Sequence, residues 1–162
     1  MKRAAAVLAA VGSLVMVTST GSHAQAYNIN INNYNSGKCL EIEDSSTDNG
    51  ARAQQWDCRG QEGSIFHRID VGPGDQFMLV NRLSGKCLEV ADSRNDNGAP
   101  IQQWTCNKAV RGMLWVPTGL AGVYLNYGSG KALEVENRSY SNGARIQQWE
   151  WAGENSQRWR LG

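Results

Sequence analysis

The side chains that could support chemistry recur at matching places along this sequence. Each Ser-Gly-Lys-Cys/Ala-Leu segment ends in a glutamate, and each Asn-Gly-Ala turn leads to a Gln-Gln-Trp segment; together they contribute Glu41, Gln54 and Trp56, then Glu89, Gln102 and Trp104, then Glu134, Gln147 and Trp149. On an extended strand, the first glutamine and the tryptophan share one face, which makes that face partly polar. Large aromatic residues in a small β protein are usually buried. A core role and an exposed, ligand-stacking role are therefore both open for the tryptophans.

A catalytic use of these residues has little support. Hydrolysis of a glycosidic bond needs two carboxylates that lie about 5 to 10 Å apart. Glu134 and Glu136 share a strand face, but Ala91 takes the place of Glu136 in the second occurrence of the pattern. His67 is the only histidine beyond residue 26, and no nucleophile motif lies beside it. We expect no enzymatic activity, no catalytic residue and no cofactor.

The four cysteines form two pairs with the same spacing. Cys39 and Cys58 are 19 residues apart, as are Cys87 and Cys106. In an oxidising compartment, an even number of cysteines at matched spacing indicates a disulfide within each pair, and each closed loop should stabilise the fold by about 3 kcal/mol. The single histidine and the lack of a Cys-x-x-Cys motif argue against a zinc site. We therefore expect two disulfides and no metal.

These residues belong to a repeat that runs through the chain. Trp104 lies 48 residues after Trp56, and Trp149 lies 45 residues after Trp104. The three repeats cover about residues 27–74, 75–120 and 121–162. Within them, short stretches of alternating apolar and polar residues, separated by Ser-Gly and Asn-Gly turns, predict four strands per repeat. The predicted strands cover residues 28–34, 38–42, 52–57, 65–69, 77–81, 86–90, 101–105, 113–116, 123–127, 131–135, 145–150 and 157–161.

The elements that position the recurring residues are therefore strands, because no window of the sequence has the apolar period of a helix. Three four-stranded repeats cannot bury their apolar faces separately, whereas closure around a shared centre with pseudo-threefold symmetry buries all of them. The closing strands carry Phe66, Trp115 and Trp159, which we predict to be core residues. A solenoid would have the same period, but three repeats is the minimum for one and neither end has a polar capping variant.

The first 26 residues have the composition of a secretory signal peptide. A basic start is followed by an apolar run from Ala4 to Val17 and by small residues up to Ala26, after which we predict cleavage. The apolar run is too short to span a membrane comfortably. We expect residues 27–162 to form one exported domain that is secreted, soluble and monomeric.

The charge balance argues against two classes of partner. Lys2 and Arg3 lie in the predicted signal peptide, so 14 of the 16 basic residues and all 15 acidic residues remain in the exported part. Binding to a phosphate backbone needs a basic patch that neutralises several phosphates. We expect no nucleic-acid partner and no membrane insertion.

The repeated motifs resemble those of the ricin B-type lectin family, which includes carbohydrate-binding modules of secreted bacterial glycosidases. The resemblance covers residues 27–162 and rests on four features: a Gly-Lys-Cys-Leu-acid-aliphatic strand, a Gln-x-Trp strand, a cysteine two residues after that tryptophan and a closing aromatic strand. It implies an all-β fold, the β-trefoil, with three tandem four-stranded repeats that can each carry one shallow sugar site. The implied function is that of a secreted, non-catalytic lectin whose partner is a polysaccharide or glycan.

The resemblance also implies a role for each recurring residue. The acid accepts hydrogen bonds from two sugar hydroxyls, the tryptophan stacks on the apolar face of the sugar ring, and amides of the glutamine and of the closing strand complete the site. All three repeats carry Glu where the family's well-characterised sites use the shorter Asp, which should move the carboxylate outward. The weaker sites comprise Glu41, Gln54 and Trp56 in the first repeat and Glu89, Gln102 and Trp104 in the second.

The closing strands distinguish the three repeats. Ser156-Gln157 is close to the family's Asn-Gln pair, whereas the first repeat has Gly63-Ser64 at this place and the second has Gly112-Met113. The third repeat should therefore hold the best sugar site, formed by Glu134, Gln147, Trp149, Ser156 and Gln157. The two changed strands and the use of Glu leave an alternative open: a trefoil that has lost sugar binding and serves as a protein-interaction or inhibitory module.

Overall fold

The computed structural model of this protein describes residues 27–72 and 74–162, and the predicted signal peptide lies outside these residues. The described chain is all-β, as predicted. Its strands are β1 (Ile31–Asn33), β2 (Cys39–Ile42), β3 (Ala53–Trp56), β4 (Phe66–Asp70), β5 (Phe77–Asn81), β6 (Cys87–Val90), β7 (Ile101–Trp104), β8 (Trp115–Pro117), β9 (Tyr124–Asn126), β10 (Ala132–Val135), β11 (Ile146–Trp149) and β12 (Trp159–Leu161). Each of the twelve predicted strands is present, and most are shorter than predicted.

Six single-turn 3-10 helices, which the sequence did not predict, separate the strands. They are η1 (Glu43–Ser45), η2 (Glu62–Ser64), η3 (Ala91–Ser93), η4 (Arg111–Met113), η5 (Glu136–Arg138) and η6 (Asn155–Gln157). Three-residue helices have no apolar period that a sequence pattern could reveal. In every repeat, one 3-10 helix follows the first strand of the hairpin and another follows its second strand. The helices therefore recur with the same period as the strands.

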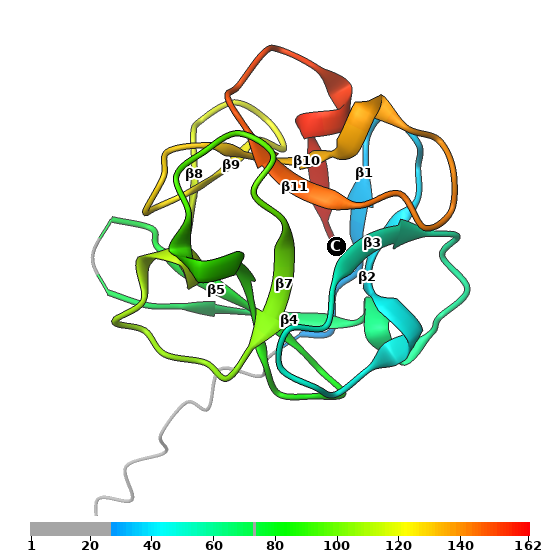
Figure 1. Cartoon of the computed structure of the whole chain (residues 1–162), viewed down its shortest axis with the longest axis horizontal. Helices are drawn as coiled ribbons and strands as arrows, with labels where there is room; N and C mark the ends of the chain where they lie inside the picture. Colours follow the sequence, from blue (N-terminus) through cyan, green and yellow to red (C-terminus); the bar gives the residue numbers. More distant parts are fainter. Residues whose placement is uncertain (1–26, 73) are drawn as a thin grey trace, which may run out of the picture.

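The strand pairing closes the three repeats into one ring. Within the repeats, β2 pairs with β3, β6 with β7, and β10 with β11. Between repeats, β4 pairs with β5, β8 with β9, and β12 with β1, always antiparallel. In Figure 1, β3, β7 and β11 surround the centre of the view. The pairing of β12 with β1 gives the predicted pseudo-threefold closure and excludes an open solenoid.

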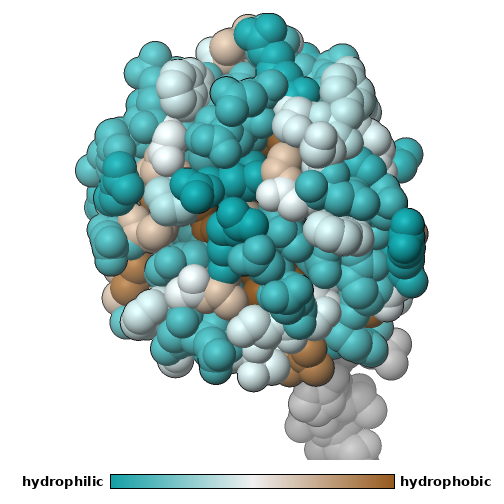
Figure 2. All heavy atoms as spheres, turned by 45° about the vertical axis from the view of Figure 1, so that its right-hand side comes forward, coloured by the Kyte–Doolittle hydropathy of each residue, from teal (hydrophilic) through white to brown (hydrophobic). Residues whose placement is uncertain are grey.

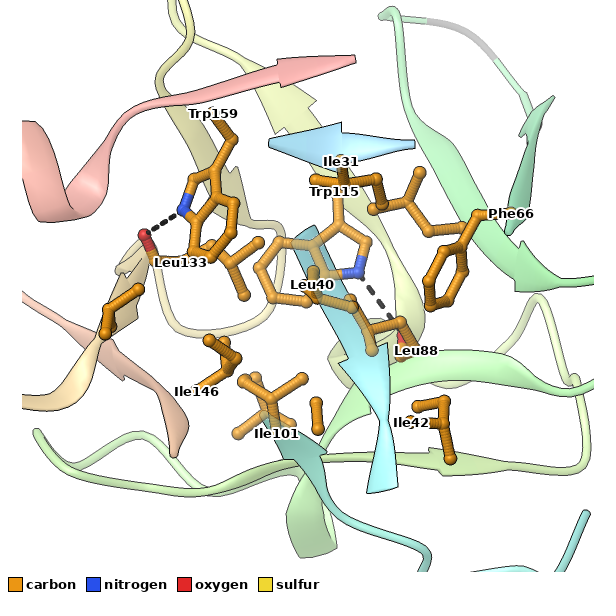
Figure 3. Close-up of a cluster of buried hydrophobic side chains, with 14 of the residues drawn as sticks. Ile31, Leu40, Ile42, Phe66, Leu88, Ile101, Trp115, Leu133, Ile146 and Trp159 are labelled. Atoms are coloured by element: carbon orange, nitrogen blue, oxygen red, sulfur yellow. Dashed lines mark hydrogen bonds between the residues drawn. The ribbon is translucent and has the colours of Figure 1, made fainter. Parts of the chain in front are cut away.

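The core consists of equivalent residues from the three repeats (Figure 3). The closing-strand aromatics Phe66, Trp115 and Trp159 are fully buried, which confirms their prediction as core residues. The Trp115 indole donates a hydrogen bond to the Leu88 carbonyl over 3.3 Å, and the Trp159 indole donates to the Leu133 carbonyl over 2.9 Å. Burial of these indoles therefore leaves no polar atom of the ring without a partner.

A second set of buried residues links each repeat to another one. Gln148 is fully buried, accepts a hydrogen bond from the Ser129 hydroxyl, and donates from Nε2 to the carbonyls of Arg94 and Asp96 in the second repeat. The equivalent bonds run from Gln103 to the first repeat and from Gln55 to the third. These bonds satisfy each amide completely, so the three repeats hold one another in a cyclic order.

Both predicted disulfides are present. Cys39 is bonded to Cys58 and Cys87 to Cys106, with Cα–Cα distances of 5.2 and 5.0 Å. Each bond ties the first strand of a hairpin to the segment that follows its second strand. The face shown in Figure 2 is covered mainly by hydrophilic residues, with apolar atoms in small separate patches. Among the described residues, no helix is long and apolar enough to cross a membrane.

Candidate functional site

The hairpin register places the recurring acid, amide and ring side by side. On β10 and β11, Glu134 is paired directly with Gln147, and Trp149 follows two residues later on the same face. The same register pairs Glu41 with Gln54 and Glu89 with Gln102. The three tryptophans Trp56, Trp104 and Trp149 are 36%, 43% and 41% exposed. Of the two roles open to them, the core role is therefore excluded.

A pocket of about 410 Å³ surrounds this group in the third repeat. Its lining residues are Glu134, Asn137, Arg138, Gln147, Trp149, Ala152 and Glu154. Trp149 contributes an exposed ring, whereas Glu134 is only 8% exposed. Arg138 and Glu154 form an ion pair of 3.0 Å at the rim. The pocket thus combines a flat apolar ring with a buried hydrogen-bond acceptor.

The two other residues predicted for the third-repeat site lie behind the pocket. Gln157 is buried in η6, where its Nε2 donates to the Glu150 carbonyl over 2.8 Å and points to the Glu134 carboxylate over 3.5 Å. Its Oε1 accepts a hydrogen bond from the Ala152 amide over 2.9 Å. Ser156 is also buried, and its hydroxyl oxygen has no hydrogen-bond partner within the described part of the chain. Gln157 therefore orients the carboxylate, and neither residue lines the pocket.

The second repeat has the larger pocket, about 490 Å³. Its lining residues are Glu89, Asp92, Ser93, Gln102, Trp104, Thr105, Cys106, Asn107, Val110 and Met113. The Gln102 amide donates to one oxygen of the Glu89 carboxylate over 2.9 Å. Met113 occupies the place of Gln157, so its sulfur, rather than an amide oxygen, accepts the hydrogen bond of the Asn107 amide over 3.3 Å. This pocket therefore keeps the acid and the ring but lacks the closing-strand amide.

In the first repeat, an amide that sequence comparison missed supports the acid. Gln61 donates from Nε2 to the Glu41 carboxylate over 3.3 Å and to the Asp57 carbonyl over 3.0 Å. Its Oε1 accepts from the Arg59 amide over 2.9 Å. These are the bonds that Gln157 makes in the third repeat, although Gln61 lies three residues before Ser64, which holds the position of Gln157. In the sequence, the only indication of this role was the presence of a glutamine in the loop before the closing strand.

Burial sets the electrostatics of the three acids. Glu41, Glu89 and Glu134 are 6%, 6% and 8% exposed, so the longer side chain does not carry the carboxylate outward as expected. The amide hydrogen bonds hold each carboxylate back against the hairpin. Loss of solvation raises the pKa of all three carboxyls above the ordinary value, and the amide hydrogen bonds partly oppose this change.

In each repeat, two consecutive residues of the 3-10 turn after the acid-bearing strand, also missed from the sequence, adopt a left-handed backbone, and the first of the two is an Asp or Asn. Asp44, Asp92 and Asn137 have φ values of 54°, 54° and 55°. Asp and Asn tolerate this conformation better than most residues. Asp92 and Asn137 line their pockets. The recurrence of a short acid or amide at this place could have indicated them.

Each pocket tryptophan also contacts a turn that belongs to another repeat. A Cβ placed on Gly98 of the second repeat would lie 3.8 Å from Cζ3 of Trp149, and the Glu150 amide donates to Asn97 Oδ1 over 3.0 Å. The Asn-Gly turn of the first repeat makes the same contacts with Trp104 and Thr105, and that of the third repeat makes them with Trp56 and Asp57. Each candidate site is therefore built from two repeats.

The chain resembles known proteins both in sequence and in structure. The model of the ricin-type beta-trefoil lectin domain matches residues 27–159. No match was found among the curated proteins. The designed 3-fold symmetric protein ThreeFoil is 35% identical over 83% of this chain and 96% of its own, with a TM-score of 0.77.

Two natural proteins have similar solved structures. The exo-beta-1,3-galactanase of Clostridium thermocellum is 34% identical over 83% of this chain, with a TM-score of 0.76, and the match covers 29% of the galactanase. The Rhizoctonia solani agglutinin is 16% identical over 84% of this chain and 94% of its own, with a TM-score of 0.74. At that identity the agglutinin supports the fold alone.

Proposed function

Because this chain belongs to the family of ricin-type β-trefoil lectin domains, we propose that it binds a sugar of a polysaccharide or glycan without catalysing a reaction. The observation that carries this proposal is the third-repeat pocket, in which the exposed Trp149 ring stands beside the Glu134 carboxylate and the Gln147 amide. A pyranose has one apolar C–H face and a rim of hydroxyls. It can stack on the ring while its hydroxyls donate to the carboxylate.

The burial of the acid suits this role. A hydroxyl that donates to an ionised carboxylate makes a charge-assisted hydrogen bond, and low solvent access strengthens such bonds. Gln157 holds the carboxylate of Glu134 from behind, so little orientational freedom is lost when the sugar binds. We propose the same role for Glu89 with Trp104 and for Glu41 with Trp56. Several shallow sites on one chain would bind a repeating polymer with avidity.

The acids around the pockets support a role without catalysis. In the third repeat, the second acid is Glu154, which precedes η6 and is paired with Arg138. In the second repeat, the second acid is Asp92, which lies in η3. A reacting pair of carboxylates needs one fixed arrangement across the sugar bond. Acids that come from different elements in the two pockets fit a variable binding rim better.

We also propose that the protein is exported after cleavage at Ala26 and acts as a secreted monomer. Two disulfides fit an oxidising compartment. The mainly hydrophilic face in Figure 2 offers no broad apolar surface for a second copy. The near balance of basic and acidic residues fits a partner that is neither nucleic acid nor an anionic membrane.

The test is a binding assay on residues 27–162 against a carbohydrate array and soluble polysaccharides, with β-1,3-galactan as the first probe because of the similar galactanase. Trp149→Ala and Trp104→Ala should each weaken binding, and the double variant should remove most of it. Leu120→Ala is the control, because Leu120 is 50% exposed and lines neither pocket. Failure of the wild-type protein to bind any carbohydrate would favour the protein-interaction or inhibitory module instead.

A further inference from the structure

The pocket of the second repeat has an apolar wall where that of the third repeat is polar. Val110 is half-buried and Met113 is 2% exposed, and both line the second pocket beside the disulfide-bonded Cys106. The matching positions of the third repeat hold Glu154 and Gln157. The wall of the third-repeat pocket is therefore a charged side chain with an amide behind it, whereas the wall of the second-repeat pocket consists of apolar carbon and sulfur atoms.

This wall is the outer edge of a larger apolar cluster. Met113 packs in one buried cluster with Met78, Val80, Cys87 and Leu114, and Val110 and Cys106 pack against that cluster. The cluster behind the wall supports the Met113 side chain by close packing. A ligand group placed against Val110 therefore meets an apolar surface with packed side chains behind it.

Three polar groups of the same pocket lie in other elements, whereas Thr105 and Asn107 share the segment between β7 and η4 with Val110. Glu89 and Gln102 come from the hairpin β6–β7, and Asp92 comes from η3. Trp104 provides an exposed ring. A sugar that stacks on Trp104 and hydrogen-bonds to Glu89 would bring another of its substituents to the wall. A hydroxyl placed against the Val110 and Met113 side chains would lose water without gaining a hydrogen bond from either of them, which is unfavourable.

We propose that the second-repeat pocket selects sugars that carry a methyl group outside the ring, and that Val110 and Met113 make this selection. Two common sources of such a methyl are an acetamido group and a 6-deoxy carbon. Burial of one methyl group should raise affinity about fourfold, and the loss of a poorly placed hydroxyl adds to this. The inference rests on the proposed sugar binding and adds a chemical class of sugar to one of its sites.

The test follows the indole N–H signals of Trp104 and Trp149 by NMR while single sugars are added to residues 27–162. The probes are galactose, N-acetylgalactosamine and 6-deoxygalactose, with glucose and N-acetylglucosamine as a second configuration. At Trp104, at least one methyl-bearing sugar should bind about fourfold or more tightly than its hydroxylated parent. The acetamido and 6-deoxy probes identify which source of the methyl is preferred. Trp149 serves as the internal control and should show a smaller ratio.

Two variants make the apolar wall of the second-repeat pocket polar, and one of them introduces the glutamate found at the matching position of the third repeat. In Val110→Glu the ratio of affinities at Trp104 should fall to about one, and Val110→Thr, which keeps the shape, should lower it part of the way. The Trp149 signal reports whether each variant is folded. Equal affinities for methyl-bearing and parent sugars at Trp104 of the wild-type protein overturn this inference and leave the proposed function intact. If no sugar shifts either signal, both proposals fail.

Discussion

Each of the three recurring acids is buried in a short strand whose residues are all buried. Glu134 is 8% exposed, and the desolvation that follows raises its pKa above the ordinary value of 4.5. The amide hydrogen bonds from Gln157 and Gln147 oppose this shift without cancelling it. Without a ligand, the ionised carboxylate is therefore poorly solvated. A ligand that donates hydrogen bonds to the carboxylate would stabilise its ionised form.

This arrangement predicts opposite effects of pH on stability and on binding. With its raised pKa, Glu134 takes up a proton in the folded state before it does so in the unfolded chain. Its contribution to the free energy of unfolding is therefore fully present below pH 4.5 and is lost as the pH rises through the raised pKa. Sugar affinity should do the reverse, because a protonated carboxyl no longer accepts two hydroxyl hydrogen bonds.

Glu134→Gln provides the measurement. Urea denaturation between pH 4 and pH 8 should show this variant gaining stability relative to the wild-type protein as the pH rises, while titration should show that sugar binding at Trp149 is weakened at neutral pH. Glu136→Gln is the control, because Glu136 is more exposed and does not line the pocket. A stability difference that is independent of pH would contradict the role assigned to burial.

We expect Gln61 to contribute as much to the stability of the first repeat as Gln157 contributes to that of the third, although the two residues do not hold matching positions in their repeats. Gln61→Leu removes the hydrogen bonds to Glu41, to the Asp57 carbonyl and from the Arg59 amide. It should lower the free energy of unfolding by about 1 to 3 kcal/mol, because the buried Glu41 carboxylate and the partly buried Asp57 carbonyl lose a hydrogen-bond donor. Gln157→Leu should have a similar effect. In thermal denaturation, Gln76→Leu should change little, since no hydrogen bond of the Gln76 side chain occurs within residues 27–72 and 74–162.

At the scale of elements, the strands could be predicted because turns and alternation mark them in every repeat. The register of each hairpin then brought Glu134 opposite Gln147 and placed Trp149 on the same face. The 3-10 helices could not be predicted, since single turns carry no period. Gln61 could not be predicted for another reason. A motif compares residues at matching positions, whereas the Glu41 carboxylate accepts a hydrogen bond from any amide that lies within reach, including one at a different position.

The third hairpin lacks the disulfide of the other two and can be given one. Ala132 is paired with Trp149 in the same register that pairs Cys39 with Trp56 and Cys87 with Trp104, so Ala132 and Trp151 stand at the two cysteine positions. The variant Ala132→Cys/Trp151→Cys should form a bond, because the natural pairs have Cα–Cα distances of 5.2 and 5.0 Å.

This third disulfide should stabilise the fold by up to about 3 kcal/mol in the chain-entropy model. Part of the gain is offset because the Trp151 ring, which packs under the Arg158 guanidinium at 5.3 Å, is removed. Thermal denaturation of the oxidised and reduced variant measures the difference, with Ala132→Ser/Trp151→Ser as the matched control. An oxidised variant no more stable than this control would show that the third hairpin does not share the geometry of the other two.

At the scale of the whole molecule, contacts between repeats complete each candidate site. The Asn97 side chain of the second repeat accepts a hydrogen bond from the Glu150 amide, next to Trp149 in the third. Asn97→Ala should therefore weaken binding at Trp149 while binding at Trp104 stays unchanged, and should lower the free energy of unfolding by about 1 kcal/mol. Asn95→Ala, an exposed change in the same loop, is the control. A loss of binding at Trp104 instead would contradict the cyclic order of the contacts.

The cyclic order also bears on how such a molecule could have arisen. A chain of one repeat would carry the acid and ring of one pocket and the Asn-Gly turn of a different pocket, and so no complete pocket of its own. In an assembly of three separate copies, the turn of each copy would contact the tryptophan of the next copy, and their association would complete all three sites together. In a lineage that began with one repeat, duplication and fusion would then have preserved sites that already existed in a trimer. The differences among the three pockets, such as Met113 against Gln157, could accumulate only after fusion, when each copy had become free to diverge from the other two.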